Sequence, residues 1–311
     1  MFCVRAYIWI VLLSLVFVVV GCSPAAQAPA LDGNNAFDML KNQVDIGPRY
    51  PGSSGHDTAA DYIVSQLKPY ADSVTVQSSS QVVGGKTLEV KNIAAVFNPR
   101  ARKWILLCAH WDSRPFADME IDAAKKKMPI LGANDGASGV AVLLELARAF
   151  SHRKPDVGVF MEFFDGEDYG KTEATMYLGS RHFAQNLATE AVVEGKPVKF
   201  AYGILLDMVG DKNLDIYEEP NSIDAAPEIV DKVWNMADRL GYAAQFIPKS
   251  GLSIDDDHIP LIKAGVKCID VIDFNYGPWH TLDDTPDKCS AKSLTIVGDV
   301  VEHVVYAEKP E

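Results

Sequence analysis

The sequence predicts one α/β domain arranged as a three-layer sandwich, in which a mixed, mostly parallel sheet lies between two layers of helices. Two observations predict this class. Short, continuously apolar segments, typical of strands buried on both faces, alternate with longer segments whose apolar residues recur at helical spacing. Strands that alternate with helices are typical of sheets covered on both faces. No internal repeat or linker follows residue 36, so we predict a single domain over residues 36–311.

Each predicted element follows from its apolar pattern and from the turn residues around it. In residues 54–70, apolar side chains at positions 59, 62, 63 and 67 share one helical face, and a serine precedes them as a candidate cap. Gly84-Gly85 marks a turn between two strands. The predicted strands are residues 73–77, 88–97, 104–109, 157–164, 203–208 and 266–272, and the predicted helices are residues 54–70, 136–150, 173–186, 225–240 and 293–306.

The N-terminal segment has the composition of a secretory signal. Arg5 precedes an almost unbroken apolar run that ends at residue 20, which is short for a membrane-spanning helix. The run is followed by Gly21-Cys22 and a stretch rich in Pro and Ala, an ending that resembles a bacterial lipobox. We therefore predict a signal peptide over residues 1–21, a lipidated Cys22 and a tether over residues 22–35. A plain signal peptide and an uncleaved anchor are the alternatives.

Composition and charge argue against two kinds of site. The chain has 29 Lys and Arg residues against 42 Asp and Glu residues, a formal net charge of −13. Nucleic-acid binding needs a basic surface that neutralises phosphates, so no nucleic-acid partner is expected. The three cysteines of the predicted domain, Cys108, Cys268 and Cys289, form no CxxC pair, which argues against a cysteine-ligated zinc site. Cys108 and Cys268 lie in apolar runs and are predicted to be buried thiols.

Acidic residues and histidines follow the ends of the predicted strands. Ligands of open α/β sheets bind outside the carboxyl ends of the strands. Residues 110–134 also form a polar stretch that is too long for a simple connector and is therefore a candidate functional segment. The candidate residues at these ends are His110, Asp112, Asp135, Asp165, Glu167, Asp168, Asp207, His280, Asp283 and Asp284.

Each of these residues has an ordinary structural explanation when it is taken alone. Asp135 suits a helix N-cap, His280 suits a surface turn, and Glu167 and Asp168 suit a solvated acidic pair. Together they indicate more, because carboxylates gathered in a cleft repel one another unless a cation or a proton compensates them. Asp, Glu and His are ligands that suit zinc, so the pattern predicts a zinc site at this edge of the sheet.

Eight segments, in order, resemble the zinc-dependent glutaminyl cyclases of animals and their bacterial relatives. They are IGPRYPGSSG, NIAAVFNPRARKWILLCAHWDSR, LGANDGASGVAVLLELARAF, VFMEFFDGEDYG, YLGSRHFA, LLDMVG, DDDHIPLIKAGV and WHTLDD. The resemblance runs from about Asp45 to His303, and FFDGED, DDDHIP and WHTLDD are its most specific parts. The parent clan is that of the two-zinc aminopeptidases, so the resemblance implies their fold.

The resemblance implies a glutaminyl-peptide cyclotransferase, an enzyme of the aminoacyltransferase class. Such an enzyme closes the N-terminal Gln of peptides and proteins into pyroglutamate and releases ammonia, with the help of zinc. By the family pattern, one zinc per chain is held by Asp135, Asp168 and His280, which leaves one coordination position open. Glu167, next to a ligand in the sequence, matches the family's general acid/base.

The resemblance also implies roles around this centre. Asp256 and Asp207 match acids that assist the proton transfers, and the counterpart of Asp207 binds the second metal in the two-zinc relatives. The counterpart of His110 is likewise a metal ligand there but usually not in the cyclases. His258 fits a residue that holds a ligand or an acid in place, with a satisfied loop histidine as the alternative.

The walls of the substrate pocket are the least defined part of the prediction. Candidate walls are Trp279, Phe274 and Tyr276, for which ordinary core packing is the alternative. The chain also departs from the animal pattern at two positions: Glu173 replaces a pocket Trp, and Ala109 replaces a cysteine that is usually disulfide-bonded. Trp111 and Phe116 are the aromatic residues that we consider as substitutes for the missing Trp.

Two other functions remain open at this point. The first is a two-zinc aminopeptidase of the same clan, because its five ligand positions are occupied by His110, Asp135, Asp168, Asp207 and His280. The second is a non-catalytic binding lipoprotein, which predicts the loss of a ligand or of the base, and none is lost. The predicted anchor indicates a bacterial envelope protein that faces the periplasm or the exterior and acts on peptides or proteins with N-terminal Gln.

Overall fold

The computed structural model describes Phe2 and residues 31–310. The predicted lipidation site, Cys22, and nearly all of the predicted signal peptide lie outside the described residues. We expected the tether to end at residue 35. This bound is wrong, because helix α1 (Gly33–Asp45) already begins at Gly33. Asp32 caps this helix by accepting hydrogen bonds from the backbone N–H groups of Asn34 and Asn35. Leu31 is buried as well, so the folded domain includes residue 31.

The central sheet has six strands in the order β1-β2-β4-β3-β7-β10. Its strands are β1 (Ser73–Val83), β2 (Lys86–Phe97), β3 (Trp104–His110), β4 (Gly158–Phe164), β7 (Phe200–Asp207) and β10 (Cys268–Ile272). The last four run parallel to one another, whereas β2 runs antiparallel to both β4 and β1. The predicted mixed, mostly parallel sheet is therefore confirmed.

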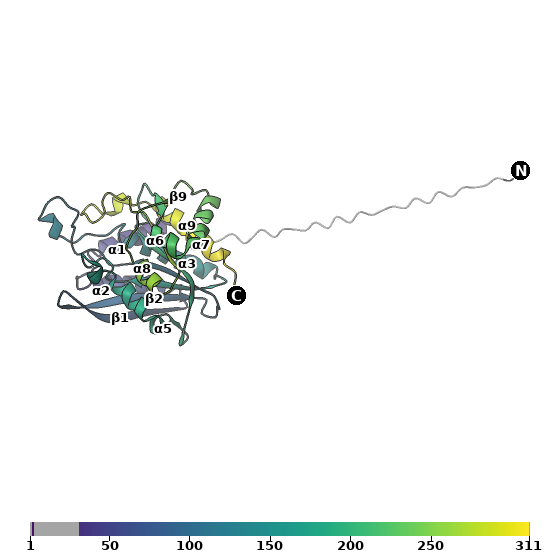
Figure 1. Ribbon diagram of the computed structural model, residues 1–311, viewed down its shortest axis with the longest axis horizontal. Helices are drawn as coiled ribbons and strands as arrows, with labels where there is room; N and C mark the ends of the chain where they lie inside the picture. The colour runs from purple at the N-terminus through teal and green to yellow at the C-terminus, as the bar shows by residue number, and fades with distance from the viewer. Residues whose placement is uncertain (1, 3–30, 311) are drawn as a thin grey trace.

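Helices cover both faces of the sheet. One layer contains α1, α2 (His56–Leu67), α3 (Ala137–His152), α7 (Pro227–Arg239) and α9 (Ala291–Ala307), which share one hydrophobic cluster with alternate residues of the strands. The opposite cluster contains residues of α4 (Leu178–Gln185), α8 (His258–Lys263) and the segment after α5 (Leu187–Glu190). Figure 1 shows α1, α3 and α9 on one side of the β1–β2 hairpin and α5 on the other. Among the described residues, no helix is long and apolar enough to cross a membrane.

Short elements complete the fold. They are α6 (Pro220–Ala225), the pairs β5 (Val192–Val193) with β6 (Lys196–Pro197) and β8 (Ile216–Glu218) with β9 (Phe246–Ser250), and three 3₁₀ turns at Lys125–Lys127, Glu173–Thr175 and Pro286–Lys288. The helix predicted over residues 173–186 begins only at Leu178, because Tyr177 adopts a left-handed backbone conformation (φ 57°) that interrupts it. Cys108, Cys268 and Cys289 are free and buried, as the apolar runs predicted for the first two.

The close approach of α3 to the sheet positions the polar residues at the strand ends. The paired strands β3 and β4 end together at His110 and Phe164, and β10 and β7 end together at Ile272 and Asp207. A Cβ atom on Gly139 would lie 2.1 Å from the carbonyl oxygen of Leu206, so only glycine lets α3 pack this closely on β7. The N-terminus of α3 therefore reaches the same edge as the strand ends.

Candidate metal centre

Asp135, Asp168 and His280 meet at the carboxyl edge of the parallel strands. Each of them presents a ligand atom, and these atoms lie within 4.8 Å of one another. His280 Nε2 lies 3.6 Å from Oδ2 of Asp135 and 3.5 Å from Oδ2 of Asp168. Asp135 precedes α3, Asp168 follows β4, and His280 lies in the loop after β10. The structure thus brings together the three predicted zinc ligands from three separate parts of the chain.

A second group of ligands shares Asp135 with the first. His110 Nε2 lies 3.2 Å from Oδ1 of Asp135 and 3.1 Å from Oδ1 of Asp207, and the three residues form a second candidate metal group. His110 and Asp207 are the last residues of β3 and β7. The carboxylate of Asp135 therefore lies between two sets of donors, which is the arrangement that a pair of metal ions would need.

The donor chemistry of the first group fits a zinc ion. Its atoms are two carboxylate oxygens and an imidazole nitrogen, all from side chains that are at least nine-tenths buried. Oδ2 of Asp168, which faces His280, has no hydrogen-bond partner. Burial and the neighbouring charge of Asp135 raise the pKa of Asp168. An unpartnered buried oxygen among like charges is what a bound cation would satisfy.

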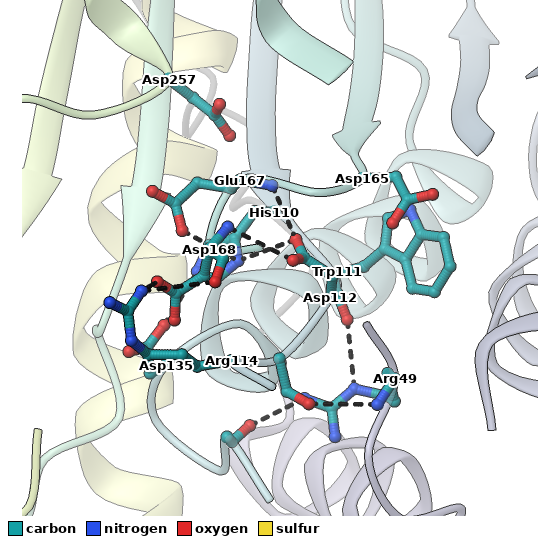
Figure 2. A network of polar contacts seen from close by, with 12 residues as sticks. Arg49, His110, Trp111, Asp112, Arg114, Asp135, Asp165, Glu167, Asp168 and Asp257 are labelled. Atoms are coloured by element: carbon teal, nitrogen blue, oxygen red, sulfur yellow. Dashed lines mark hydrogen bonds and ion pairs between the residues drawn. The ribbon is translucent and has the colours of Figure 1, made fainter. Parts of the chain in front are cut away.

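Glu167 lies beside the metal group with its side chain largely buried. Burial, followed by the charge of Asp168, raises its pKa well above the ordinary value for glutamate. The backbone is held by Asp112, whose two carboxylate oxygens accept from the N–H groups of Glu167 and Asp168 at 3.0 and 3.3 Å. Figure 2 shows Glu167 beside His110 and Asp168 at the end of β4. This position suits a group that exchanges protons with a molecule bound at the metal group.

A cavity of about 440 Å³ opens over these residues. Its polar lining consists of Arg114, Asp118, Asp135, Glu167, Asp168, Asp207, Ser253, Asp255, Asp256 and His280. The predicted walls Trp279 and Phe274 line it as well, with their ring centroids 4.9 Å apart. Trp279 also stacks on the ring of His280 at 3.8 Å. The cavity combines one apolar wall with a cluster of titratable groups, which is typical of a small-molecule or peptide-terminus site.

Comparison with known proteins identifies the family. Residues 92–305 match the family described as peptidase family M28. The chain belongs to peptidase family M28. Its curated relatives include a glutaminyl-peptide cyclotransferase of Drosophila melanogaster, which is 27% identical over 88% of this chain and 83% of the relative.

Two solved structures share most of the fold of this chain. A glutaminyl cyclase of Bacteroides thetaiotaomicron bound to N-acetylhistamine is 38% identical, with a TM-score of 0.86 over 91% of this chain and 100% of that one. A leucine aminopeptidase precursor of the same organism is also 38% identical, with a TM-score of 0.87 over 92% of this chain and 100% of that one. Similarity of the fold therefore does not by itself separate the two activities.

Asp256 lines the cavity of this M28 chain, and His258 is fully buried behind it. Burial, and after it the charge of Asp207, raises the pKa of Asp256 to about 7. His258 is fully buried between carboxylates, with Nε2 3.3 Å from Glu219 and Nδ1 3.9 Å from Asp270. These residues form an acidic cluster that adjoins the cavity through Asp256. Neither ring nitrogen of His258 has a hydrogen-bond partner, so the holding role that the resemblance implied stays a prediction.

Tyr276 is not a wall of the M28 cavity, contrary to the sequence prediction. Its hydroxyl group donates to Asp284 at 2.8 Å, and its ring is buried against Met208 and Ile272. Asp284 in turn accepts from the backbone N–H groups of Asn134 and Asp135. Tyr276 therefore supports the turn that carries Asp135. Its hydrogen bond holds the carboxylate of Asp284, which accepts from the backbone of that turn.

Neither aromatic residue considered for the missing pocket Trp lines the cavity. Trp111 is fully buried, stacks on His56 and donates its indole N–H to the backbone carbonyl of Lys91. The ring of Phe116 contacts the guanidinium of Arg114 and the ammonium of Lys171, at 4.4 and 4.3 Å. The cavity walls are completed instead by aliphatic and thioether side chains and by a tyrosine, which are Met119, Met176, Tyr177, Met208, Leu252, Ile254 and Ile272.

Arg114 and Asp118 are the site residues that sequence reasoning missed. Arg114 donates to both carboxylate oxygens of Asp118, at 2.8 and 3.0 Å, and also contacts the carboxylate of Asp168. Asp118 Oδ1 lies 3.4 Å from Nδ1 of His280, on the side of the ring away from the metal group. The available signal was the polar stretch over residues 110–134, which indicated function without indicating which of its residues act.

Arg49 supports the other side of the site. Its buried guanidinium donates to the carbonyl groups of Trp111, Leu131 and Gly132, at 3.1, 2.7 and 2.8 Å (Figure 2). Trp111 directly precedes Asp112, and Leu131 and Gly132 lie shortly before Asp135. A side chain far away in the sequence thereby holds two of the site's loops together.

Proposed function

We propose that this M28 chain is a zinc-dependent glutaminyl-peptide cyclotransferase that converts the N-terminal Gln of peptides and proteins to pyroglutamate. One observation carries the proposal: Glu167, a buried carboxyl group with a raised pKa, lies beside the group of Asp135, Asp168 and His280 in the lining of one cavity. This combination suits an acid/base that moves a proton within one small substrate. The Drosophila and Bacteroides relatives that bear the cyclase names support it.

Asp135, Asp168 and His280 would hold one zinc ion per chain. A zinc ion held there would polarise the carbonyl group of the substrate's γ-carboxamide and so make its carbon more electrophilic. The proposal of a single ion is supported by His110, whose Nε2 lies within 3.2 Å of both Asp135 and Asp207. A protonated Nε2 at that position would interact with both carboxylates in place of a second ion.

The protein side chains carry the proton through the reaction. The α-amine nitrogen of the substrate attacks the γ-carbonyl carbon, a new C–N bond closes the ring, and the bond to the amide nitrogen breaks. Glu167 accepts one proton from the α-amine and delivers it to the departing nitrogen, which leaves as ammonia. Asp256 and Asp207 both line the same cavity, and Asp207 contacts His110, so the two carboxyl groups would stabilise the charge that develops during the transfer.

Trp279 and Phe274 supply the orientation that ring closure needs. The reaction is intramolecular, so holding the glutamine side chain folded toward its own amine is a large part of catalysis. The indole of Trp279 lies flat against His280 and forms an apolar wall next to the metal group. The aliphatic part of a glutamine side chain would pack on this wall with its carboxamide toward Asp135 and Asp168.

The second candidate function is a two-zinc aminopeptidase. It is favoured by the position of Asp135 between two sets of donors and by the structural similarity to a leucine aminopeptidase precursor. The two proposals differ in metal content, since the peptidase needs two ions per chain. They also differ in product, because a peptidase releases a free amino acid and shortens the peptide.

One assay separates these functions. Purified protein is incubated with a Gln-initiated peptide, and the peptide mass and released ammonia are followed with and without a chelator. Loss of the mass of one ammonia, abolished by chelation and by Glu167→Gln, is expected of the cyclase. Release of free N-terminal residues would instead assign the peptidase activity, and zinc analysis of the same sample gives the number of ions.

We also propose that the enzyme is lipid-anchored through Cys22 and faces the periplasm or the exterior of a bacterial cell. The sequence after residue 20 supports this, and a mass spectrum of the mature N-terminus tests it, because an unmodified Cys22 would refute the anchor. In that location the enzyme would modify exported proteins. Unchanged N-termini in the envelope proteome of a deletion strain would remove this role.

A further inference from the structure

A buried histidine from a distant part of the chain contacts the turn that carries Glu167. His56 is the first residue of α2, and its Nε2 lies 2.7 Å from Oδ2 of Asp165. Both side chains are buried, with 4% of His56 and none of Asp165 exposed. Asp165 directly follows β4 and precedes Glu167 by two residues. Figure 2 shows the side chains of Asp165 and Glu167 pointing in opposite directions from this turn.

The same imidazole packs on Trp111. The two rings are stacked, with their centroids 4.8 Å apart and an angle of 29° between their planes. Trp111 donates its backbone N–H to the carbonyl of Phe164 at 2.9 Å and directly precedes Asp112. Asp112 in turn accepts from the backbone N–H of Glu167. His56 therefore contacts both of the segments that meet at this hydrogen bond.

The carboxylate of Asp165 depends on His56 for one of its two partners. Its Oδ2 also accepts from the backbone N–H of Lys91 at 2.7 Å, whereas Oδ1 has no hydrogen-bond partner. A buried carboxylate that loses a partner is strongly destabilised, so its side chain moves toward another donor or toward water. The carbonyl group of Asp165 stays bonded to the N–H of Gly179 in α4, at 2.9 Å. Loss of the His56 contact should therefore shift the turn while the surrounding elements stay in place.

The position of Glu167 depends on this turn more than that of Asp168 does. Arg114 contacts the carboxylate of Asp168 and donates to its backbone carbonyl at 3.3 Å. The carboxylate of Glu167 lies 3.8 Å from Nδ1 of His110, which is too far for a hydrogen bond. The backbone of the turn therefore places the acid/base, whereas the neighbouring metal-group residue is also held through its side chain.

We propose that His56 is a positioning residue for the acid/base, because through Asp165 and Trp111 it fixes the turn from which Glu167 reaches the substrate. The inference rests on the proposed function, since it concerns the role assigned to Glu167 there. His56 is not among the residues that line the cavity, so it acts without touching the substrate. A displaced general base slows proton transfer and leaves the metal group and the apolar wall in place. The turnover number should therefore fall while KM is retained.

The test measures kcat, KM and zinc content with a Gln-initiated peptide. His56→Phe keeps a ring against Trp111 and removes the contact with Asp165, and its kcat should fall by about tenfold to a hundredfold. Its KM and zinc content should stay within about twofold of the wild-type values. His56→Gln keeps a nitrogen that can donate to Asp165 and should recover most of the lost kcat. Asp165→Asn should resemble His56→Phe, and the double variant should be no slower than the slower single variant, because the pair acts as a unit.

Tyr202→Phe is the matched control for loss of a buried contact. It removes the hydroxyl group that donates to the buried carboxylate of Glu308 at 3.0 Å, near the start of β7 and away from the site. We expect it to lower Tm about as much as His56→Phe does and to leave kcat within about twofold.

Three results would overturn the inference while the wild type still cyclises the peptide. They are a kcat that falls equally in Tyr202→Phe and His56→Phe, a loss of zinc that accompanies the loss of kcat, and full activity of both His56→Phe and Asp165→Asn. If His56→Phe does not fold, His56→Gln and Asp165→Asn carry the same comparison. Absence of cyclisation by the wild type would instead overturn the proposed function, and the role of His56 with it.

Discussion

Oδ1 of Asp118 lies 3.4 Å from Nδ1 of His280, and this contact joins the polar stretch after β3 to the loop after β10. Two further contacts lie beside it: the N–H of Met119 donates to the carbonyl of His280 at 3.2 Å, and Glu120 accepts from the N–H of Leu282 at 3.1 Å. His280 itself has a left-handed backbone (φ 54°), a conformation that surrounding contacts must maintain. The segment over residues 118–120 therefore orients a predicted metal ligand.

Asp118→Asn should weaken zinc binding by about tenfold to a hundredfold, because a carboxylate on the distal nitrogen fixes the orientation of a ligating imidazole. The measurement is competition of the purified protein with a zinc chelator. Asp38→Asn, the same change at an exposed position of α1, should leave the affinity unchanged. If the two variants retained zinc equally well, the contact would have no role in orienting His280.

Glu167→Gln should lower kcat for cyclisation by about 10²–10⁴-fold, since the amide cannot accept the proton of the α-amine. Zinc content should stay at the wild-type value, because Glu167 does not belong to the metal group. The matched control is Glu173→Gln, which changes an exposed carboxylate paired with Lys263. Retention of activity within about threefold by the Glu167 variant would assign the proton transfer to another group.

Trp279→Ala should raise the KM for Gln-peptides by about tenfold or more, because the indole is the apolar wall next to His280. Trp279→Phe keeps an aromatic ring at this position and should recover most of the loss. Phe116→Leu should leave KM unchanged, since that ring lies between Arg114 and Lys171 outside the cavity lining. A similar rise of KM in the Trp279 and Phe116 variants would contradict this assignment of the wall.

Glu302 should make stability depend on pH. It lies in α9 away from the site, neither carboxyl oxygen has a hydrogen-bond partner, and burial followed by Asp299 and Glu145 raises its pKa to about 8. Because this pKa is higher in the folded than in the unfolded protein, the protonated carboxyl group favours folding. Its contribution to stability is fully present at a pH below the pKa of the unfolded state. This contribution is lost as the pH rises toward 8.

Glu302→Gln should therefore match the wild type near pH 4.5 and melt at a higher temperature near pH 8. The expected gain is on the order of a few kcal/mol, or several degrees in Tm. Differential scanning calorimetry of both proteins over this pH range measures it. Glu89→Gln, an exposed change on β2, should show no such trend. A Tm difference that is constant from pH 4.5 to 8 would refute the raised pKa.

The prediction of the sheet succeeded where local pattern and tertiary environment agree. The segments around Trp104–His110 and Gly158–Phe164 are buried on both faces, so their continuous apolar runs identified them as central strands. Residues 173–177 followed a helical pattern but are interrupted by a 3₁₀ turn and by the left-handed Tyr177. The hydroxyl group of Tyr177 donates to the carbonyl of Asp255. Asp255 lies far away in the sequence, so the local pattern around residue 177 carries no sign of this contact.

The sequence alone determined the fold class and the residues at the strand ends, because strand burial and parallel pairing leave a periodic apolar signal and direct Asp135, Asp168 and Asp207 to one edge. Tertiary structure alone decided how these residues are used. It turned Tyr276 toward Asp284 and away from the cavity, and it placed Asp118 against His280. Each of these relationships depends on contacts between segments distant in the sequence, and such contacts leave no periodic signal in either segment.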